Sequence, residues 1–235
     1  MRQVESLAPV DSIPASTSSE QVLLALGTGS ALLFGGLTIA VARHVPDVRA
    51  ADLHIHLWVL VHRNDLTVAV ARWVTWGGAT LLVIPALVLV GTLSRPGPLR
   101  LRTRLGGGLL LAVTASVGIY VGLLINGGIG GVRPDVTDWA GTAGGPSYPS
   151  GHTTAASILA AACLWAAWPR LRTPRARIAV VTVAAAYALL VGLTRVWLGV
   201  HWPSDVVGGW LYAVTWSALA AAAATLARRQ NRGAR

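Results

Sequence analysis

The amino-acid sequence predicts an all-α fold, a polytopic membrane bundle of six transmembrane helices. Of the 235 residues, 54% are hydrophobic and 12% are charged, whereas soluble domains carry roughly 25% charged residues. Six apolar stretches without a charge recur along the chain, each near the roughly 17 to 25 residues that span a bilayer. The basic residues form short clusters between these stretches instead of one continuous surface. These three observations together exclude an ordinary water-soluble domain.

The first element is a polar segment, residues 1–20, which is rich in Ser and Pro and is expected to be a disordered cytoplasmic tail. The transmembrane domain is expected over residues 21–227 and a basic tail over residues 228–235. A cleaved signal peptide is the less favoured interpretation of the first apolar stretch, because twenty polar residues precede it and it lacks a small-residue cleavage pattern.

The six predicted spans cover residues 22–42, 74–93, 105–124, 153–168, 178–193 and 206–227. The fourth and fifth are short, so they reach across a bilayer only if the flanking Arg and Trp side chains lie at its two interfaces.

The segment between the first two spans, residues 47–65, mixes three histidines with apolar side chains and is typical of a helix lying in the membrane interface. A metal site formed by His54, His56 and His62 is the alternative. Three histidines without a carboxylate or cysteine at ligand spacing are a weak signal for a metal, so the interfacial helix is preferred. We predict no metal and no other cofactor.

The arginine distribution predicts the orientation in the plasma membrane. The chain contains no lysine, and thirteen of its nineteen arginines lie in segments that the six spans place on one side. The positive-inside rule then predicts that both termini are cytoplasmic. The net charge of +10 does not indicate a nucleic-acid partner, because the basic clusters alternate with membrane spans.

This topology places three polar segments on the outer face. The first contains Arg133 and Pro134, after a Gly-rich run at the end of the third span. The second, residues 147–152, opens the fourth span, and the third, residues 194–205, links the last two spans. Charged residues at membrane depth are costly, so their convergence on one face predicts a functional site.

The residue types in these segments suit an anion. Arg133 and Arg195 offer planar, permanently charged donor groups that match the oxygens of a phosphate. Ser150 and Gly151 directly precede a predicted helix, where free backbone amides and the helix dipole favour negative charge. We therefore expect these four residues to bind a phosphate group.

A nucleophile and an acid are also present. His201 and Asp205 are four residues apart, so one helical turn lets the carboxylate accept from one ring nitrogen and leaves the other nitrogen as a nucleophile. His152 is then available to protonate a leaving oxygen. Taken singly, each segment also fits a helix cap or a loop, and only their combination predicts catalysis.

These motifs resemble the type 2 phosphatidic acid phosphatase (PAP2) family, whose relatives include bacterial acid phosphatases and vanadium haloperoxidases. The matching positions, at the family's spacings, are Arg133-Pro134, Pro149-Ser150-Gly151-His152, Arg195, His201 and Asp205. The resemblance extends over residues 124–210 and implies an acid phosphatase/haloperoxidase-like helical core with the site at its outer end.

Two positions depart from the family pattern. Asn126 stands where the family has a lysine, which removes a full charge from the implied phosphate pocket. Thr194 stands where the family usually has serine, and it keeps the hydroxyl group. We expect both residues to line the phosphate pocket, with Asn126 lowering its affinity.

The resemblance implies a lipid phosphatase that needs no metal. His201 would attack phosphorus, Asp205 would orient it, and His152 would protonate the leaving group. The implied substrate is a lipid phosphate or pyrophosphate, such as a polyprenyl pyrophosphate, phosphatidylglycerophosphate or phosphatidate. The alternatives are a lipid phosphotransferase using the same histidine, a non-catalytic lipid-binding protein and, less favoured, a haloperoxidase. The bilayer and the lipid are the expected partners, and the sequence indicates no oligomeric state.

Overall fold

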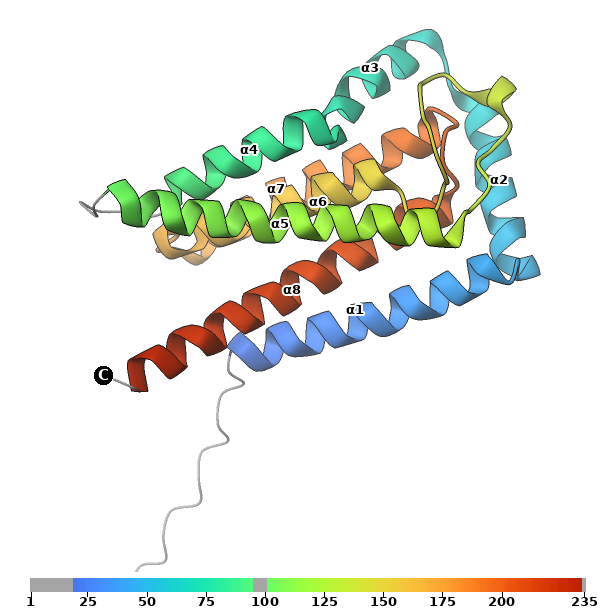
Figure 1. Ribbon diagram of the computed structural model, residues 1–235. Coiled ribbons are helices and arrows are strands. Elements are labelled where there is room, and N and C mark those ends of the chain that lie inside the picture. Colours follow the sequence, from blue (N-terminus) through green and yellow to red (C-terminus); the bar gives the residue numbers. More distant parts are fainter. Residues whose placement is uncertain (1–18, 95–100, 234–235) are drawn as a thin grey trace, which may run out of the picture.

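The computed structural model describes residues 19–94 and 101–233, and every regular element within them is a helix (Figure 1). The α-helices are α1 (Ser19–Ala42), α2 (Pro46–His62), α3 (Asp65–Thr75), α4 (Thr80–Leu93), α5 (Leu101–Ile129), α6 (Gly151–Ala167), α7 (Pro174–Trp197) and α8 (Pro203–Gly233). Three short 3-10 helices are η1 (Trp76–Gly78), η2 (Val136–Asp138) and η3 (Trp168–Arg170). The predicted all-α fold is confirmed.

The predicted tails fall largely outside this description. Residues 1–18 of the expected N-terminal tail are not among the described residues, and α1 begins at Ser19. At the other end, α8 continues to Gly233 and so includes most of the segment expected to be a basic tail.

The long helices run along one common direction, and α6 lies among the others. It packs against α4, α5, α7 and α8, while α1 packs against α8. The core around it includes Leu87, Ile119, Ala155, Ile158 and Tyr212. Small residues let helices approach closely, as at Gly91 and Gly108, where a Cβ on either glycine would meet the backbone of the other helix.

A helix forms at each of the six predicted spans, but the count of six is not confirmed. Within the described residues, four helices are long and apolar enough to cross a membrane, or five if the bent pair α3–α4 is one span. The helix at the predicted span 153–168, α6, has 17 residues and is about 26 Å long, shorter than the roughly 30 Å of a bilayer core.

The predicted span over residues 74–93 is interrupted near its beginning. The chain bends by 50° between α3 and α4, where η1 contains Gly77 and Gly78. A Cβ on Gly78 would lie 2.6 Å from the carbonyl oxygen of His152, so only glycine allows the chain to pass this close to the start of α6. The break therefore brings α3 and η1 against the polar end of the bundle.

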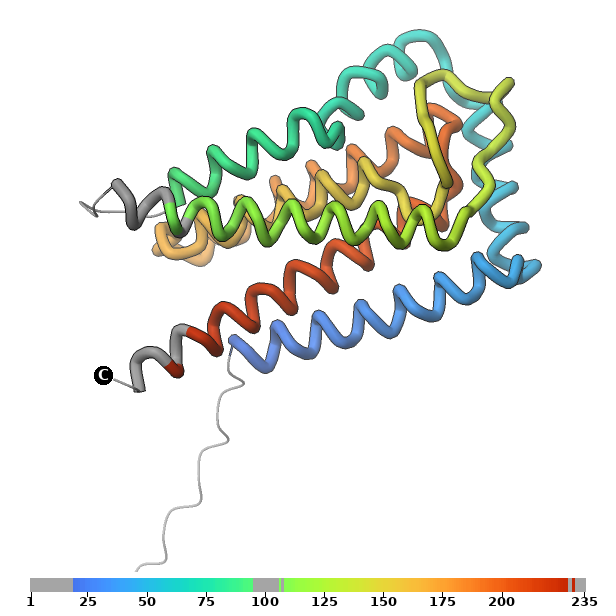
Figure 2. Tube along the Cα trace, viewed as in Figure 1, coloured from blue at the N-terminus to red at the C-terminus, as the bar shows by residue number. Residues whose placement is uncertain are grey.

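Helix α2 lies across that same end of the bundle (Figure 1). The helix predicted within residues 47–65 is thus present, with Asp52, His56 and Val59 on its buried face. Its position in a membrane interface stays a prediction. The long connection between α5 and α6 folds back over the same end, beside α2 (Figure 2).

Candidate active site

Backbone hydrogen bonds join the three polar segments at the end of the bundle crossed by α2. The Ser147 amide donates to the Gly131 carbonyl over 2.8 Å, and the Ser150 amide donates to the Asp205 carbonyl over 3.0 Å. Farther along, the Ala140 amide donates to the Leu198 carbonyl over 2.9 Å. The convergence that the sequence predicts is therefore present in the fold.

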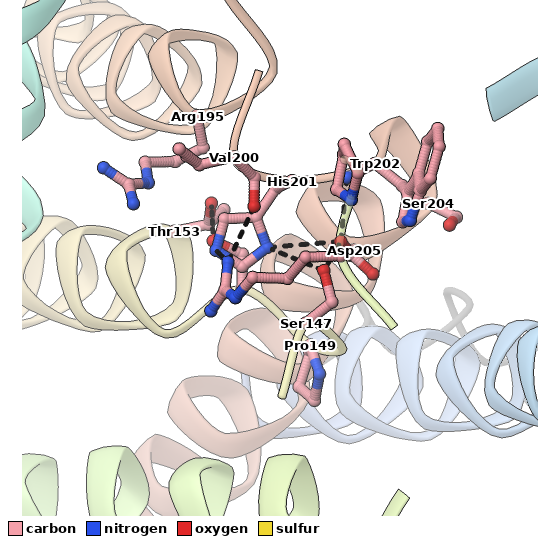
Figure 3. A network of polar contacts seen from close by, with 12 residues as sticks. Ser147, Pro149, Thr153, Arg195, Val200, His201, Trp202, Ser204 and Asp205 are labelled. Carbon is pink, nitrogen blue, oxygen red and sulfur yellow. Dashed lines mark hydrogen bonds and ion pairs between the residues drawn. The ribbon is translucent and has the colours of Figure 1, made fainter. Parts of the chain in front are cut away.

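His201 and Asp205 form a buried pair at the centre of the site (Figure 3). The imidazole Nδ1 lies 3.2 Å from Asp205 Oδ2, as the four-residue spacing predicts. The same carboxylate oxygen accepts from the Trp202 amide over 2.8 Å and from the Ser147 hydroxyl. Because this acceptor faces Nδ1, the network assigns the ring proton to Nδ1 and leaves the lone pair on Nε2.

The Nε2 atom of His201 faces the cationic side of the site. Nη1 of Arg133 lies 2.9 Å from it. Burial lowers the pKa of His201 to about 4, and the charges of Arg133 and Arg195 act in the same direction against the opposing effect of Asp205. A neutral imidazole with an accessible lone pair is the protonation state that a nucleophile needs.

Arg133 organises the loop that carries it. It donates to the carbonyl oxygens of Gly144, Gly145, Pro146 and Val200 over 2.7 to 3.0 Å. Burial lowers its pKa below the ordinary range of arginine. These contacts hold a positive charge next to His201, and within the described part of the chain no carboxylate forms an ion pair with it, which suits the binding of an anion.

Arg195 is buried and one of its donors has no partner among the described residues. Its Nη1 donates to the Thr75 hydroxyl over 2.9 Å and its Nη2 to the Thr142 carbonyl over 3.2 Å. The Nε atom is buried without a hydrogen bond. A buried charged donor left unpaired is costly, so this nitrogen is a candidate donor to an anion bound at the site.

The start of α6 supplies the third side of the site. Ser150 precedes the first helical residue, Gly151, so the amides of the first turn lack partners within the helix. The Ser150 hydroxyl accepts from the Thr153 hydroxyl over 3.0 Å. His152 is half-buried in this turn, and burial, together with the charges of Arg195, His201 and Arg133, lowers its pKa to about 3.

The two positions that depart from the family pattern have local partners. Asn126 lies in the last turn of α5, and its Nδ2 donates to the carbonyls of Pro146 and Pro149 over 3.0 and 3.1 Å. Thr194 donates its hydroxyl to the Val191 carbonyl over 2.6 Å. Both side chains are thus engaged with backbone, and the predicted contact of either with phosphate stays a prediction.

Sequence reasoning overlooked three side chains that shape the site. Ser147 donates to the same carboxylate oxygen of Asp205 that faces His201. Its position within the second polar segment could have indicated a role in the site. Thr75 holds Arg195 from the distant α3, and Asp52 binds the start of α8 from α2. No local pattern marks these two residues, because the contacts arise only from helix packing.

The histidines of α2 have separate partners. His56 Nε2 lies 3.0 Å from Asp138 Oδ2, whereas His62 Nδ1 lies 2.8 Å from the Trp58 carbonyl oxygen. His54 is exposed. In the part of the chain that is described, no group of three or more His, Cys, Asp or Glu side chains is arranged to hold a metal ion.

The family model of the PAP2 superfamily matches residues 106–229. The chain is 36% identical over 114 residues to a lipid A 1-phosphatase of Rhizobium etli, which covers 41% of this chain and 45% of that protein. It is 28% identical over 174 residues to phosphatidylglycerophosphatase B of Bacillus subtilis, which covers 74% of this chain and 83% of that protein. The chain therefore spans about half the length of the lipid A 1-phosphatase.

Two crystal structures have a similar arrangement of helices. A transmembrane PAP2-type phosphatidylglycerolphosphate phosphatase from Bacillus subtilis superposes with a TM-score of 0.73 at 25% identity, over 83% of this chain and 94% of that one. Aquifex aeolicus LpxE gives a TM-score of 0.52 at 17% identity, over 71% of this chain and 92% of that one. At this identity the similarity concerns the fold only. The bundle is thus of the PAP2 membrane type.

Proposed function

The chain belongs to the PAP2 superfamily, and on that premise we propose that it is a multi-pass membrane phosphatase that hydrolyses a lipid phosphate through a phosphohistidine. The observation that carries the proposal is the buried His201–Asp205 pair. Its Nδ1 is bound to the carboxylate, while its Nε2 faces the guanidinium of Arg133.

The first step is attack on phosphorus. The Nε2 lone pair of His201 forms a bond to phosphorus while the bond from phosphorus to the lipid oxygen breaks. His152, which the negative charge of the bound phosphate would keep protonated, gives a proton to that oxygen. Asp205 stabilises the positive charge that develops on the imidazole. In the second step His152 takes a proton from water, and the water oxygen displaces His201 to release inorganic phosphate.

The arginines and the start of α6 would hold the equatorial phosphate oxygens. Arg195 has a buried Nε donor to which no described residue is bound, and a phosphate oxygen would satisfy it. The unpaired amides of the first turn of α6 offer further donors, and Ser150 offers a hydroxyl. A phosphate in this position would lie between Arg133 and His201 and replace their mutual contact. Charge stabilisation of this kind dominates phosphoryl transfer.

The relatives favour a lipid phosphate as the substrate. Their names, lipid A 1-phosphatase and phosphatidylglycerophosphatase B, both describe phosphatases of membrane lipids. We place phosphatidylglycerophosphate first among the candidates. The reason is that phosphatidylglycerophosphatase B and the phosphatidylglycerolphosphate phosphatase structure, both from Bacillus subtilis, are each matched over most of their own length. The arginine distribution supports cytoplasmic termini and a site on the outer face.

The test is phosphate release by the purified protein in detergent, with phosphatidylglycerophosphate, a polyprenyl pyrophosphate, phosphatidate and lipid A as substrates. Release without an added acceptor distinguishes a hydrolase from a phosphotransferase. His201→Ala should abolish both turnover and an acid-labile phosphoenzyme, because it removes the nucleophile. His54→Ala, which changes an exposed histidine on α2, is the matched control and should behave as the wild type. Turnover retained by His201→Ala would contradict the mechanism.

A further inference from the structure

A carboxylate of α2 contacts the helix that carries Asp205. Asp52 is buried, and its two oxygens accept two hydrogen bonds from one residue, Ser204. Oδ1 accepts from the Ser204 amide over 2.8 Å, and Oδ2 accepts from the Ser204 hydroxyl over 2.6 Å. The contact joins residues 152 positions apart and ties α2 to the first turn of α8.

This contact is a helix cap supplied from another helix. Because α8 begins at Pro203, the Ser204 amide is one of the first-turn donors that have no partner within the helix. A carboxylate at this end also interacts favourably with the helix dipole. Asp205, the next residue, binds the Trp202 amide from within the same turn. The turn that presents the carboxylate to His201 is thus held from inside by Asp205 and from outside by Asp52.

The same face of α2 also supports the loop that carries His201. One turn after Asp52, His56 binds Asp138 at 3.0 Å, and its ring lies 5.2 Å from that of Trp202. The Asp138 carbonyl in turn lies against Gly199, where a Cβ would come within 2.5 Å of its oxygen. Gly199 has a φ of +71°, a conformation that favours glycine. Helix α2 therefore contacts the α8 end of the loop between α7 and α8 directly, and it reaches Gly199 at the other end through Asp138.

We propose that Asp52 is a positioning residue, which caps α8 from α2 and so holds Asp205 in the orientation that aligns His201. This inference rests on the proposed function for its catalytic consequence. The contact itself is a property of the fold and can be measured without any substrate.

The kinetic test compares Asp52→Ala with Asp52→Asn. Alanine removes the cap, so kcat should fall at least about tenfold while KM stays within about twofold, because the nucleophile is misaligned and the phosphate ligands are unchanged. Asparagine is as good a cap as aspartate, and its amide can still accept from the Ser204 amide and donate to the hydroxyl. Asp52→Asn should therefore restore most of kcat. Asp47→Ala, on the exposed face of α2, is the matched control and should leave kcat unchanged.

Asp52 borders a cavity of about 620 Å³ that none of the predicted phosphate ligands lines. Water can therefore replace the lost carboxylate, and Asp52→Ala need not leave a sealed void. If this variant is not recovered folded, Ser204→Ala removes the hydroxyl contact alone and should lower kcat in the same direction.

Hydrogen exchange measured by mass spectrometry reads the contact without turnover. The amides of Trp202 and of residues 204–206 should exchange faster in Asp52→Ala than in the wild type, and at the wild-type rate in Asp47→Ala. If the wild type hydrolysed no lipid phosphate, the proposed function would be wrong. The exchange measurement would still show whether Asp52 caps the start of α8. The positioning role is overturned if exchange is unchanged in Asp52→Ala, if that variant keeps wild-type kcat, or if Asp52→Asn is as slow as Asp52→Ala.

Discussion

Asn126 offers a sharp test of how the site is assembled, because the structure gives it two contacts that its sequence position does not reveal. Its single amide nitrogen donates to the carbonyls of Pro146 and Pro149, which lie on the loop leading into Ser150. Asn126→Leu keeps the branched shape and the number of non-hydrogen atoms of the side chain, and it removes both N–H donors. Each net hydrogen bond is worth about 1 kcal/mol, so the free energy of unfolding should fall by about 2 kcal/mol.

The loss should also reach the phosphate pocket. Pro149 directly precedes Ser150 and the start of α6, so loosening this loop misplaces the donors that we expect to bind phosphate. KM should rise and inhibition by vanadate, an analogue of the phosphoryl group, should weaken several-fold. The assays are steady-state kinetics with a vanadate titration, alongside thermal unfolding in the same detergent.

The matched control is Asn64→Leu. Asn64 caps α3 by accepting from the Thr67 amide, so its loss should cost about 1 kcal/mol of stability. It should leave KM and vanadate inhibition unchanged, because Asn64 lies at the end of α3 opposite Thr75, the residue of that helix that contacts Arg195. If Asn126→Leu were destabilised but kept wild-type KM and vanadate inhibition, the loop contacts would be structural only and the reasoning would be refuted.

Asn126→Lys addresses the charge that the family pattern places at this position. An added ammonium within reach of the phosphate should strengthen inhibition by phosphate and vanadate about tenfold, since charge-assisted hydrogen bonds contribute roughly 1.5 to 3 kcal/mol. Unaltered inhibition would mean that this position does not line the phosphate pocket.

Three further predictions concern protonation, metal independence and topology. Because burial lowers the pKa of His201 to about 4, its imidazole stays neutral as pH falls through 6.5, and the acid limb of kcat/KM should lie below 6.5. The same shift should reduce the free energy of unfolding as pH falls from 6.5 to 4, since the unfolded histidine takes up its proton first; an acid limb at or above 6.5 would contradict the burial argument. Activity should persist in EDTA and fall with vanadate, and chelator-sensitive activity restored by zinc or magnesium would count against the metal-free mechanism. In a Cys163→Ala background, a cysteine at the exposed Gly144 should react with an impermeant thiol reagent in intact cells, whereas one at Thr173 should react only after lysis. Labelling in the opposite order would place the site in the cytoplasm.

Local features of the sequence were sufficient for the fold class and for the central pair. Apolar stretches of membrane length predict helices because a bilayer leaves the backbone few other ways to satisfy its hydrogen bonds. A spacing of four residues brings His201 and Asp205 together on one turn, and their 3.2 Å contact is the expected one. The number of spans was less predictable, because hydropathy does not register a break such as the one at Gly77 and Gly78.

The partners of the site residues were decided by tertiary structure alone. Asp52 contacts Ser204 and Thr75 contacts Arg195, in both cases between helices that are distant in the sequence. Asn126 contacts the loop before α6, which is nearer in the sequence. Such contacts depend on how helices cross and on where glycine permits close approach, and neither leaves a periodic signal in the sequence. The sequence therefore predicted which residues could carry the chemistry, and the packing of α2, α3 and α5 around them decided how each one is held.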